Sequence, residues 1–217
     1  MGDPDRLAEA FDAVAGGYDD AYHDHVARAL VELVAPAGDE SVADVACGTG
    51  AVALTIARQR PPTGPAVLAV DISAEMVAAG RARAERLGRP VAVDWRVGPA
   101  VPLPVPDGVV DVILCASSLH FLGTGAIVDW RRALRPGGRC GFTLPVASLF
   151  RAGGVFADLV AADLPLPETE QEACALAGDT GFVDAAARTI AVGSRRVILI
   201  MATNRPQHGD EPGVVNR

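Results

Sequence analysis

Short apolar runs alternate with helical patterns along most of the chain, and this alternation restricts the folds that the chain can adopt. Runs typical of buried strands occur at residues 41–46, 67–70, 91–97, 110–115 and 139–144. Helical patterns separate most of these runs. Because repeated strand–helix units place their strands in a parallel sheet with helices on both faces, the sequence predicts an α/β, doubly wound (Rossmann-like) fold with a mostly parallel sheet.

The last apolar runs depart from this alternation. Residues 183–191 and 197–203 flank Gly193-Ser194, a pair typical of a tight turn. They therefore predict an antiparallel C-terminal hairpin at the edge of the sheet, which makes seven strands in all. We expect one domain over residues 1–204, followed by a disordered tail at 205–217 that is polar and rich in Pro, Gly and Asn.

Composition narrows the possible partners. No uninterrupted apolar run reaches the roughly 18 residues that a membrane-spanning helix needs. The net charge is −8, the chain has no Lys, and its Arg residues form no run longer than a pair, so nucleic-acid partners are disfavoured. Because the N-terminal residues lack the features of a signal or transit peptide, we expect a cytoplasmic protein.

The cysteines and histidines do not predict a metal site. The chain has four cysteines: Cys47, Cys115, Cys140 and Cys174. They form no CxxC pair and lie in apolar or small-residue surroundings, so buried free thiols are expected rather than disulfides or metal ligands. His23 and His25 point about 200° apart on a helix, which favours a solvated helix face over a metal site.

The strongest local signal is a glycine-rich turn between the first strand and the following helix. In Ala46-Cys47-Gly48-Thr49-Gly50, the glycines permit a tight turn and let a ligand approach the backbone at a helix N-terminus. The second strand ends at Asp71, whose carboxylate can accept hydrogen bonds from both hydroxyls of a ribose. Both features suit an adenosine-containing cofactor. Because Gly48-x-Gly50-x-x-Ala53 also fits a dinucleotide-binding pattern, this turn alone leaves the cofactor open.

Further stretches decide between these cofactors. In chain order they are Phe11-Asp12-x-x-Ala15-x-x-Tyr18-Asp19, Asp44 to Gly50, Asp71-Ile72-Ser73 with Met76, Leu103-Pro104-Val105-Pro106-Asp107-Gly108-x-x-Asp111-Val112, and Leu134-Arg135-Pro136-Gly137-Gly138-Arg139. In this order and spacing, over about residues 11–203, the chain resembles the class I S-adenosylmethionine-dependent methyltransferases. It is most similar to their ubiquinone/menaquinone-type and natural-product small-molecule branch.

The resemblance implies an enzyme that binds S-adenosylmethionine, transfers its methyl group directly (SN2) to a small molecule and releases S-adenosylhomocysteine. It also implies N-terminal lid helices within residues 1–37 and a substrate-side insertion at 146–180. The residues implied to contact the cofactor are Tyr18, Asp44, Ala46, Gly48, Gly50, Asp71, Ile72, Met76, Gly98, Pro99, Ala100, Cys115 and Ala116.

These contacts have distinct roles by resemblance. Asp44 and the glycine-turn backbone would hold the methionine end of the cofactor, and Asp71 the ribose. Ile72 and Met76 would pack on the adenine. Tyr18 would cover the cofactor from the lid.

Four further positions bear on the cofactor contacts. Cys115 and Ala116 would line the space beside the sulfonium. The chain also departs from the family pattern at Pro99, because it has Gly98-Pro99-Ala100 where the family usually has Gly-Asp-Ala. The carboxylate that commonly binds the adenine amino group is therefore missing. Ala46 replaces the first glycine of the cofactor motif, a common variation.

His120 follows the fourth strand and should face the site. Its unperturbed pKa suits a general base, and packing or hydrogen bonding near the cofactor explains the same position. The acceptor should be small and hydrophobic, because residues 146–178 are apolar; core packing would account for them equally well. A monomer and a homodimer both stay open.

Two other functions stay open at this point. One is a protein that keeps S-adenosylmethionine intact during a cyclisation or rearrangement, a reading that Gly98-Pro99 allows. The other is an NAD(P)-dependent oxidoreductase, which is disfavoured because the chain has no Tyr-x-x-x-Lys pair.

Overall fold

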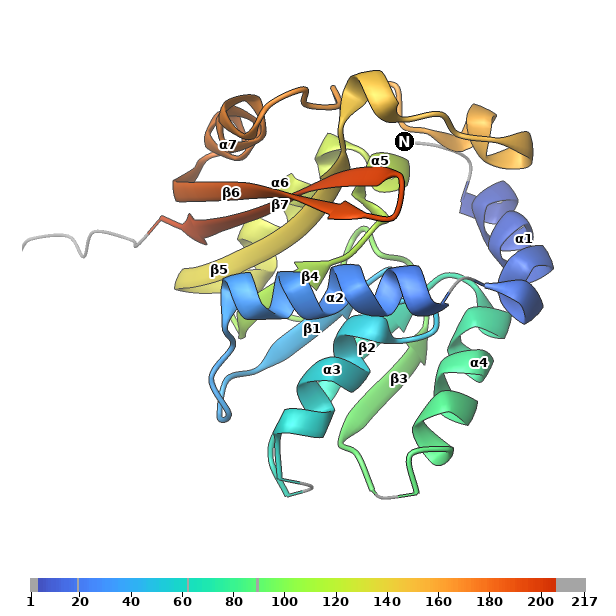
Figure 1. Ribbon diagram of the computed structural model, residues 1–217. Coiled ribbons are helices and arrows are strands. Elements are labelled where there is room, and N and C mark those ends of the chain that lie inside the picture. Colours follow the sequence, from blue (N-terminus) through green and yellow to red (C-terminus); the bar gives the residue numbers. More distant parts are fainter. Residues whose placement is uncertain (1–3, 19, 62, 89, 206–217) are drawn as a thin grey trace, which may run out of the picture.

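The computed structural model describes residues 4–18, 20–61, 63–88 and 90–205, and its centre is one seven-stranded sheet (Figure 1). The strands are β1 (Val42–Val45), β2 (Val67–Asp71), β3 (Val93–Val97), β4 (Val110–Cys115), β5 (Leu134–Pro145), β6 (Phe182–Val192) and β7 (Arg195–Asn204). Their order is β3-β2-β1-β4-β5-β7-β6, with the first five strands parallel and β7 and β6 antiparallel. The predicted fold is confirmed, including the C-terminal hairpin.

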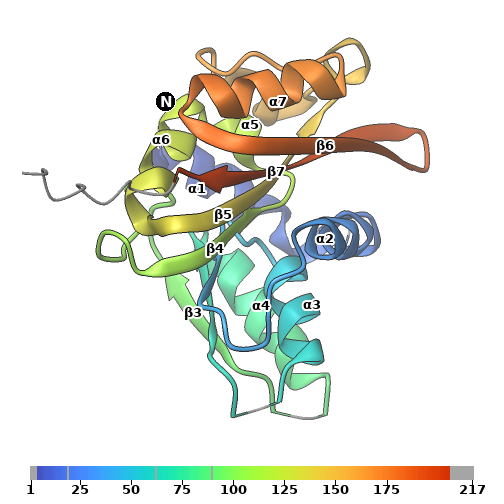
Figure 2. The same ribbon diagram turned by 90° about the vertical axis from the view of Figure 1, so that its left-hand side faces the viewer.

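Helices cover both faces of the sheet (Figures 1 and 2). They are α1 (Pro4–Val14), α2 (Asp20–Val34), α3 (Ala51–Gln59), α4 (Ala74–Glu85), α5 (Leu119–Leu122), α6 (Thr124–Ala133) and α7 (Glu170–Asp179), with 3-10 turns η1 (Ala15–Gly17), η2 (Ala147–Leu149) and η3 (Gly154–Leu159). Two buried clusters result: α2 and α3 pack on one face, and α5, α6 and α7 on the other. Along β4, Val112 and Leu114 belong to the first cluster and Ile113 to the second, as expected of a strand buried on both faces.

The start of β5 differs from the prediction. The strand begins at Leu134, which pairs with Val110, and resumes its pairing with Arg139 opposite Val112. The intervening Pro-Gly-Gly is therefore a bulge inside the strand and not a turn before it, and the preceding helix ends at Ala133. Gly137 has φ +75°, a left-handed conformation that glycine adopts without strain.

The two helices expected as a lid have different places. Helix α2 buries Val26, Leu30 and Val34 against α3, β5 and β7, so it is part of the layer that covers the sheet. Helix α1 instead contacts α4, η1 and η3 at the carboxyl end of the parallel strands, where a lid would lie. The amphipathic pattern at 19–34 predicted a buried face, but it could not tell whether the sheet or a ligand would cover that face.

Residues 146–180 are mostly irregular until α7. Leu149 and Val155 are exposed (57% and 62%), whereas Leu159 is buried, so core packing accounts for only part of this apolar segment. Among the residues that the structure describes, no helix is both long and apolar enough to cross a membrane. All four cysteines are free as predicted, and Cys47, Cys115 and Cys140 are buried. Apart from Arg205, the predicted tail lies outside the described residues.

Candidate functional site

The turn after β1 adopts the conformation that its glycines predict. Gly48 and Gly50 have φ +53° and +79°, and Gly50 caps α3. Ala46 also has a positive φ of +53°, so the alanine that stands in place of a glycine adopts a left-handed conformation that costs roughly 1–2 kcal/mol for a residue with a Cβ. The turn therefore exposes backbone where a side chain would otherwise stand.

Trp95, on β3, closes one side of this turn and was not among the predicted site residues. A Cβ placed on Gly50 would lie 2.2 Å from Trp95 Cη2, and one placed on Gly80 of α4 would lie 2.5 Å from Trp95 Cζ3. The edge of the ring formed by Cη2 and Cζ3 therefore packs closely against two glycines from different elements. A glycine in the middle of a helix is the signal that could have indicated this close packing.

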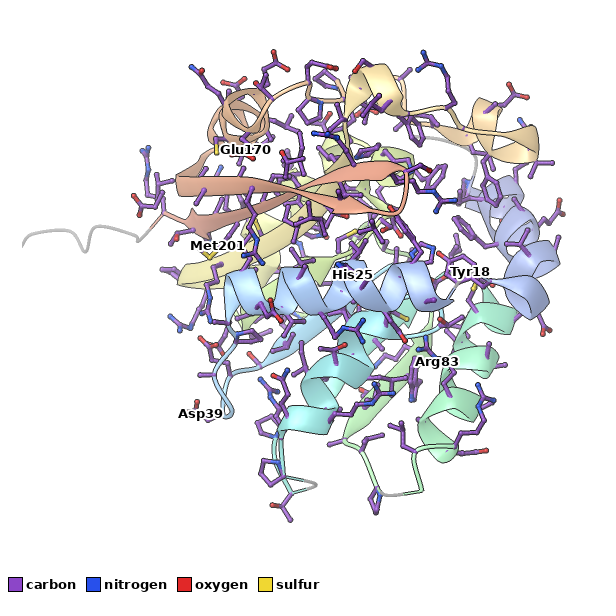
Figure 3. The ribbon with its side chains drawn as sticks, in the orientation of Figure 1. Tyr18, His25, Asp39, Arg83, Glu170 and Met201 are labelled. Atoms are coloured by element: carbon purple, nitrogen blue, oxygen red, sulfur yellow. The ribbon has the colours of Figure 1, made fainter. Side chains whose placement is uncertain are left out.

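Arg83 joins the same turn to the helices around it. Its guanidinium donates hydrogen bonds to Thr49 Oγ1 (2.8 Å) and to both carboxylate oxygens of Asp24 (2.7 and 2.9 Å). Figure 3 shows Arg83 on α4 and Tyr18 at the junction between α1 and α2. The turn is thus held from α2, α3 and α4 before any ligand binds.

Asp71 links the turns that follow β1 and β2. Its carboxylate accepts hydrogen bonds from Gly48 N (2.7 Å) and Ser73 N (2.9 Å), and burial raises the pKa of this carboxyl. Ser73 caps α4 as predicted, because its hydroxyl accepts a hydrogen bond from Met76 N (3.0 Å). The same hydroxyl donates to Asp12 Oδ1 (2.5 Å), which fastens α1 to the site.

Asp44 is almost completely buried (1% exposed) beside the same turn. It accepts a hydrogen bond from Ala53 N at 2.9 Å. Burial raises the pKa of the Asp44 carboxyl to about 8, since no cation lies next to it in the described chain to offset the loss of water. The site therefore holds a carboxyl group that a bound cation would ionise.

Two hollows lie against these residues and share Tyr18, Ala46, Gly48 and Ser118. The first hollow, of about 160 Å³, is lined by Pro4, Leu7, Phe11, Tyr18, Ala46, Gly48, Asp71, Ile72, Pro99, Ala100, Val101, Ser118, Phe121 and Leu122. The second hollow is lined by Tyr18, His23, Asp44, Ala46, Cys47, Gly48, Thr49, Ala51, Val52, Ala116 and Ser118. Among the described residues, Asp71 is the one carboxylate that lines the first hollow and Asp44 the one that lines the second.

Most of the predicted cofactor contacts meet in these hollows. Those that line them are Tyr18, Asp44, Ala46, Gly48, Asp71, Ile72, Pro99, Ala100 and Ala116. Four do not. Met76 and Cys115 are fully buried, Cys115 in the cluster on the α5–α7 face. Gly50 faces Trp95, and Gly98 N donates a hydrogen bond to Asp71 O at 2.8 Å. Both glycines therefore shape the backbone next to the hollows without lining them.

A larger cavity of about 520 Å³ adjoins the hollows. Phe11, Tyr18 and Phe121 line both this large cavity and the first hollow, and His23 lines both the cavity and the second hollow. Its full lining is Phe11, Val14, Gly17, Tyr18, Tyr22, His23, Ser117, His120, Phe121, Thr143, Pro145, Leu149, Phe150, Arg151, Ala152, Gly153, Phe156, Ser194, Arg195, Arg196 and Val197. Tyr18 is thus common to all three spaces.

Aromatic rings form one wall of the large cavity. Phe11 of α1 lies 5.6 Å from Phe121 of α5 and 5.1 Å from Phe156 of η3. His120 lies 4.2 Å from Phe121 and 5.0 Å from Phe150. This cluster joins α1 to residues 150–156, so the expected lid and the expected substrate-side segment meet across the cavity.

His23 has a different place from the one expected. Its ring stacks on Tyr18 at 4.4 Å, because the chain folds back from η1 into the first turn of α2. His25 is exposed on α2 (Figure 3), as predicted. Over the described residues, no cluster of three or more His, Cys, Asp or Glu is arranged to hold a metal ion.

His120 and Ser117 lie where β4 ends. Ser117 has φ +63°, and its amide donates to Thr143 Oγ1 at 2.7 Å. The buried Ser117 Oγ and His120 Nδ1 have no hydrogen-bond partner within the described part of the chain. Burial lowers the pKa of His120 to about 4, below the ordinary histidine value that suits a general base, so the imidazole is neutral at pH 7.

This burial predicts a specific loss of stability in acid. In the unfolded protein His120 takes up its proton near pH 6.5, whereas in the folded protein it does so near pH 4. The free energy of unfolding is therefore unaffected by His120 above about pH 6.5 and decreases as the pH falls towards 4. At pH 5 the loss should amount to about 2 kcal/mol. His120→Leu should remove that part of the difference in unfolding free energy between pH 7.5 and pH 5. His25→Leu is the matched control, and parallel pH profiles for wild type and His120→Leu would contradict the prediction.

The chain is similar to known methyltransferases. A family model described as "Methyltransferase domain" matches residues 42–138. The chain is 36% identical over 157 residues to the demethylmenaquinone methyltransferase of Tropheryma whipplei (strain Twist), covering 67% of this chain and 61% of that protein. It is 38% identical over 141 residues to the nocamycin O-methyltransferase of Saccharothrix syringae, covering 63% and 50%.

A solved structure supports the fold. The S-adenosylmethionine-dependent methyltransferase from Aquifex aeolicus superposes with a TM-score of 0.60 at 20% identity, covering 94% of this chain and 99% of that one. The sequence alignments span 61% and 50% of the lengths of the two curated relatives. The family model, at residues 42–138, includes the glycine turn and Asp71, which line the two hollows.

Proposed function

The chain belongs to the class I S-adenosylmethionine-dependent methyltransferases, and we propose that it methylates a small molecule with an apolar body. The observation that carries this proposal is the adjacency of the spaces: the hollows at the glycine turn and the large aromatic cavity share Tyr18. A cofactor in the hollows and an acceptor in the large cavity would meet there. The demethylmenaquinone and nocamycin relatives favour a quinone-like or natural-product acceptor.

The residues present fit the adenosine part of the cofactor. A carboxylate offers about four acceptor positions. Two positions of Asp71 are filled by Gly48 N and Ser73 N, which leaves two for the two hydroxyls of a ribose. Ile72 and Pro99 would flank the adenine in the first hollow. Since Pro99 supplies no carboxylate, we propose that backbone groups near Ala100 recognise the adenine.

Asp44 fits the methionine part. Its buried carboxyl lines the second hollow together with the backbone of the glycine turn, and the ammonium of the cofactor would supply the missing cation. When bound, S-adenosylmethionine supplies a methyl group that its sulfonium already activates. The chain's own contribution is therefore to orient the acceptor and to exclude water.

Two groups are placed to orient an acceptor. His120 is neutral, and it lines the large cavity among aromatic rings. We propose that it acts mainly as a positioning residue, since an imidazole with so low a pKa holds a proton weakly. Ser117 beside it is a second candidate that the sequence reading missed. The Ser117-Ser118 pair after a strand was the only available signal.

The state of Asp44 predicts proton release on cofactor binding. With a pKa of about 8, most of this carboxyl is protonated at pH 7, and the cofactor's ammonium should shift it to the carboxylate. Calorimetric titration at pH 7 in buffers of different ionisation enthalpy should therefore show release of a large fraction of one proton. Asp44→Asn should bind more weakly and abolish the release, and equal apparent enthalpies for wild type in all buffers would refute the assignment.

The experiment that tests the function is a calorimetric titration of the protein with S-adenosylmethionine, S-adenosylhomocysteine and NAD. We expect saturable binding of the first two and none of NAD. Binding of NAD, or of none of the three, would overturn the proposal. Formation of S-adenosylhomocysteine in step with product would then separate methyl transfer from a cyclisation that leaves the cofactor intact. The cytoplasmic location, the absence of a nucleic-acid partner and the choice between monomer and homodimer stay predictions.

A further inference from the structure

The charge of the large cavity is opposite to that of the protein. The chain has a net charge of −8, yet the described residues that line the cavity include three arginines and no Asp or Glu. Arg195 and Arg196 stand at the start of β7, and Arg151 follows η2. Arg195 and Arg196 are neighbours on β7, so their side chains leave opposite faces of that strand, and the guanidinium of Arg195 lies over Tyr22 of the cavity lining.

These arginines are not used in ion pairs. Other arginines bind carboxylates: Arg83 pairs with Asp24, and Arg139 with Glu40. The three cavity arginines pair with no carboxylate of the described residues. Arg195 lies over the ring of Tyr22, with its Cζ 4.5 Å from the ring centroid, and Arg151 Nη1 donates to Phe150 O at 2.6 Å. Their charge is therefore available to a ligand.

The arginines also have a defined place relative to the cofactor hollows. They line the large cavity but neither hollow, whereas Phe11, Tyr18 and Phe121 line both the cavity and the first hollow. The tip of the β6–β7 hairpin lies above α2 in both views, in keeping with the contact between Arg195 and Tyr22 (Figures 1 and 2). The cavity thus has an aromatic part that adjoins the cofactor hollows and a cationic part at the hairpin.

We propose that the methyl acceptor carries an anionic group, a carboxylate or a phosphate, that the guanidinium of Arg195 binds at the rim of the cavity, with Arg151 and Arg196 in the lining beside it. Its apolar body, of the size of one or two rings, lies among Phe121, Phe150 and the other aromatic side chains. A guanidinium suits this role, because it stays charged at all physiological pH values and binds carboxylate or phosphate through paired hydrogen bonds. The volume of about 520 Å³ falls in the usual range for a small-molecule site. This inference rests on the proposed function and specifies its acceptor.

The test compares ligands that share a naphthalene ring and carry an anionic or a neutral group on it. With the protein saturated with S-adenosylhomocysteine, binding of 6-hydroxy-2-naphthoic acid, its methyl ester and 2-naphthyl phosphate would be measured by calorimetry at pH 8. We expect at least one of the two anions to bind about tenfold more tightly than the neutral ester, as a desolvated charge-assisted contact provides. The stronger of the two identifies the anionic group.

Variants locate the effect. The double variant Arg195→Gln/Arg196→Gln should lose the preference for the anion while binding the ester as before. Arg86→Gln, the same change at an exposed arginine on α4's carboxyl end, should keep it. Equal binding of acid, phosphate and ester, no binding of any of them, or a preference that survives the double variant would overturn the inference. Titration with S-adenosylhomocysteine alone keeps the two proposals apart, since its failure counts against the proposed function and its success with no anion preference counts only against the inference.

Discussion

Asp71→Asn is expected to weaken the binding of S-adenosylmethionine and S-adenosylhomocysteine at least about a hundredfold, or about 2.7 kcal/mol. The carboxylate accepts from Gly48 N and Ser73 N and would accept from both ribose hydroxyls. An amide replaces one acceptor oxygen by an NH2 group, which would face a backbone N–H donor. Hydrogen bonds to a charged acceptor contribute about 1.5–3 kcal/mol each, so the loss of even part of this set has a large effect.

The control is Asp39→Asn, which makes the same chemical change at an exposed carboxylate far from the hollows (Figure 3). Both variants would be titrated calorimetrically, and thermal unfolding without ligand would establish that each is folded. A folded Asp71→Asn protein that binds the cofactor about as tightly as wild type would remove Asp71 from the cofactor site. Loss of binding in both variants would mean that the effect is not specific to Asp71.

The second large effect concerns stability. Gly50→Ala should lower the free energy of unfolding by about 3 kcal/mol. Part of this loss arises because the left-handed backbone disfavours a Cβ, and the rest because the new methyl group overpacks against Trp95. The Cβ would lie 2.2 Å from Trp95 Cη2 at a backbone φ of +79°. The same edge of the ring is also packed against Gly80 of α4, where an added Cβ would lie 2.5 Å from Trp95 Cζ3.

Gly48→Ala is the matched control for this prediction. Gly48 also has a positive φ, but its Cβ would come no closer than 3.9 Å to Tyr18, so only the backbone cost of about 1 kcal/mol applies. Denaturant unfolding would measure both variants. Trp95→Leu in the Gly50→Ala background should recover part of the loss. If the two alanine variants lose the same stability, close packing against Trp95 is not what requires glycine at position 50.

Much of the site was predictable because its signals are local. The glycine turn, the Ser73 cap and Asp71 at the end of a strand lie in short stretches whose backbone conformation their own residues favour. The carboxyl ends of parallel strands meet at one edge, so Asp44 and Asp71 were bound to come together once β1 and β2 were adjacent. The strands themselves were found from apolar runs, which report burial on both faces.

Other features depended on contacts between segments far apart in sequence. Trp95 meets Gly50 across 45 positions, and nothing in either stretch indicates the other. Cys115 and Ala116 were both predicted to line the space beside the sulfonium. Cys115 is the last residue of β4, and the pleat of that strand turns its side chain into the core. The low pKa of His120 likewise follows from burial, and the ring of Phe150 that packs against it comes from a different segment of the chain.

The sequence by itself therefore predicted the α/β fold, the C-terminal hairpin and most of the residues that line the two hollows, because each depends on local pattern or on the adjacency of parallel strands. The tertiary structure alone decided that α2 covers the sheet while α1 adjoins the site, and that Arg151, Arg195 and Arg196 line one aromatic cavity. Side chains from segments far apart in the sequence share one environment only after packing has brought those segments together. Burial and charge, which govern the chemistry of the acceptor, are properties of that assembled environment and not of any one stretch of chain.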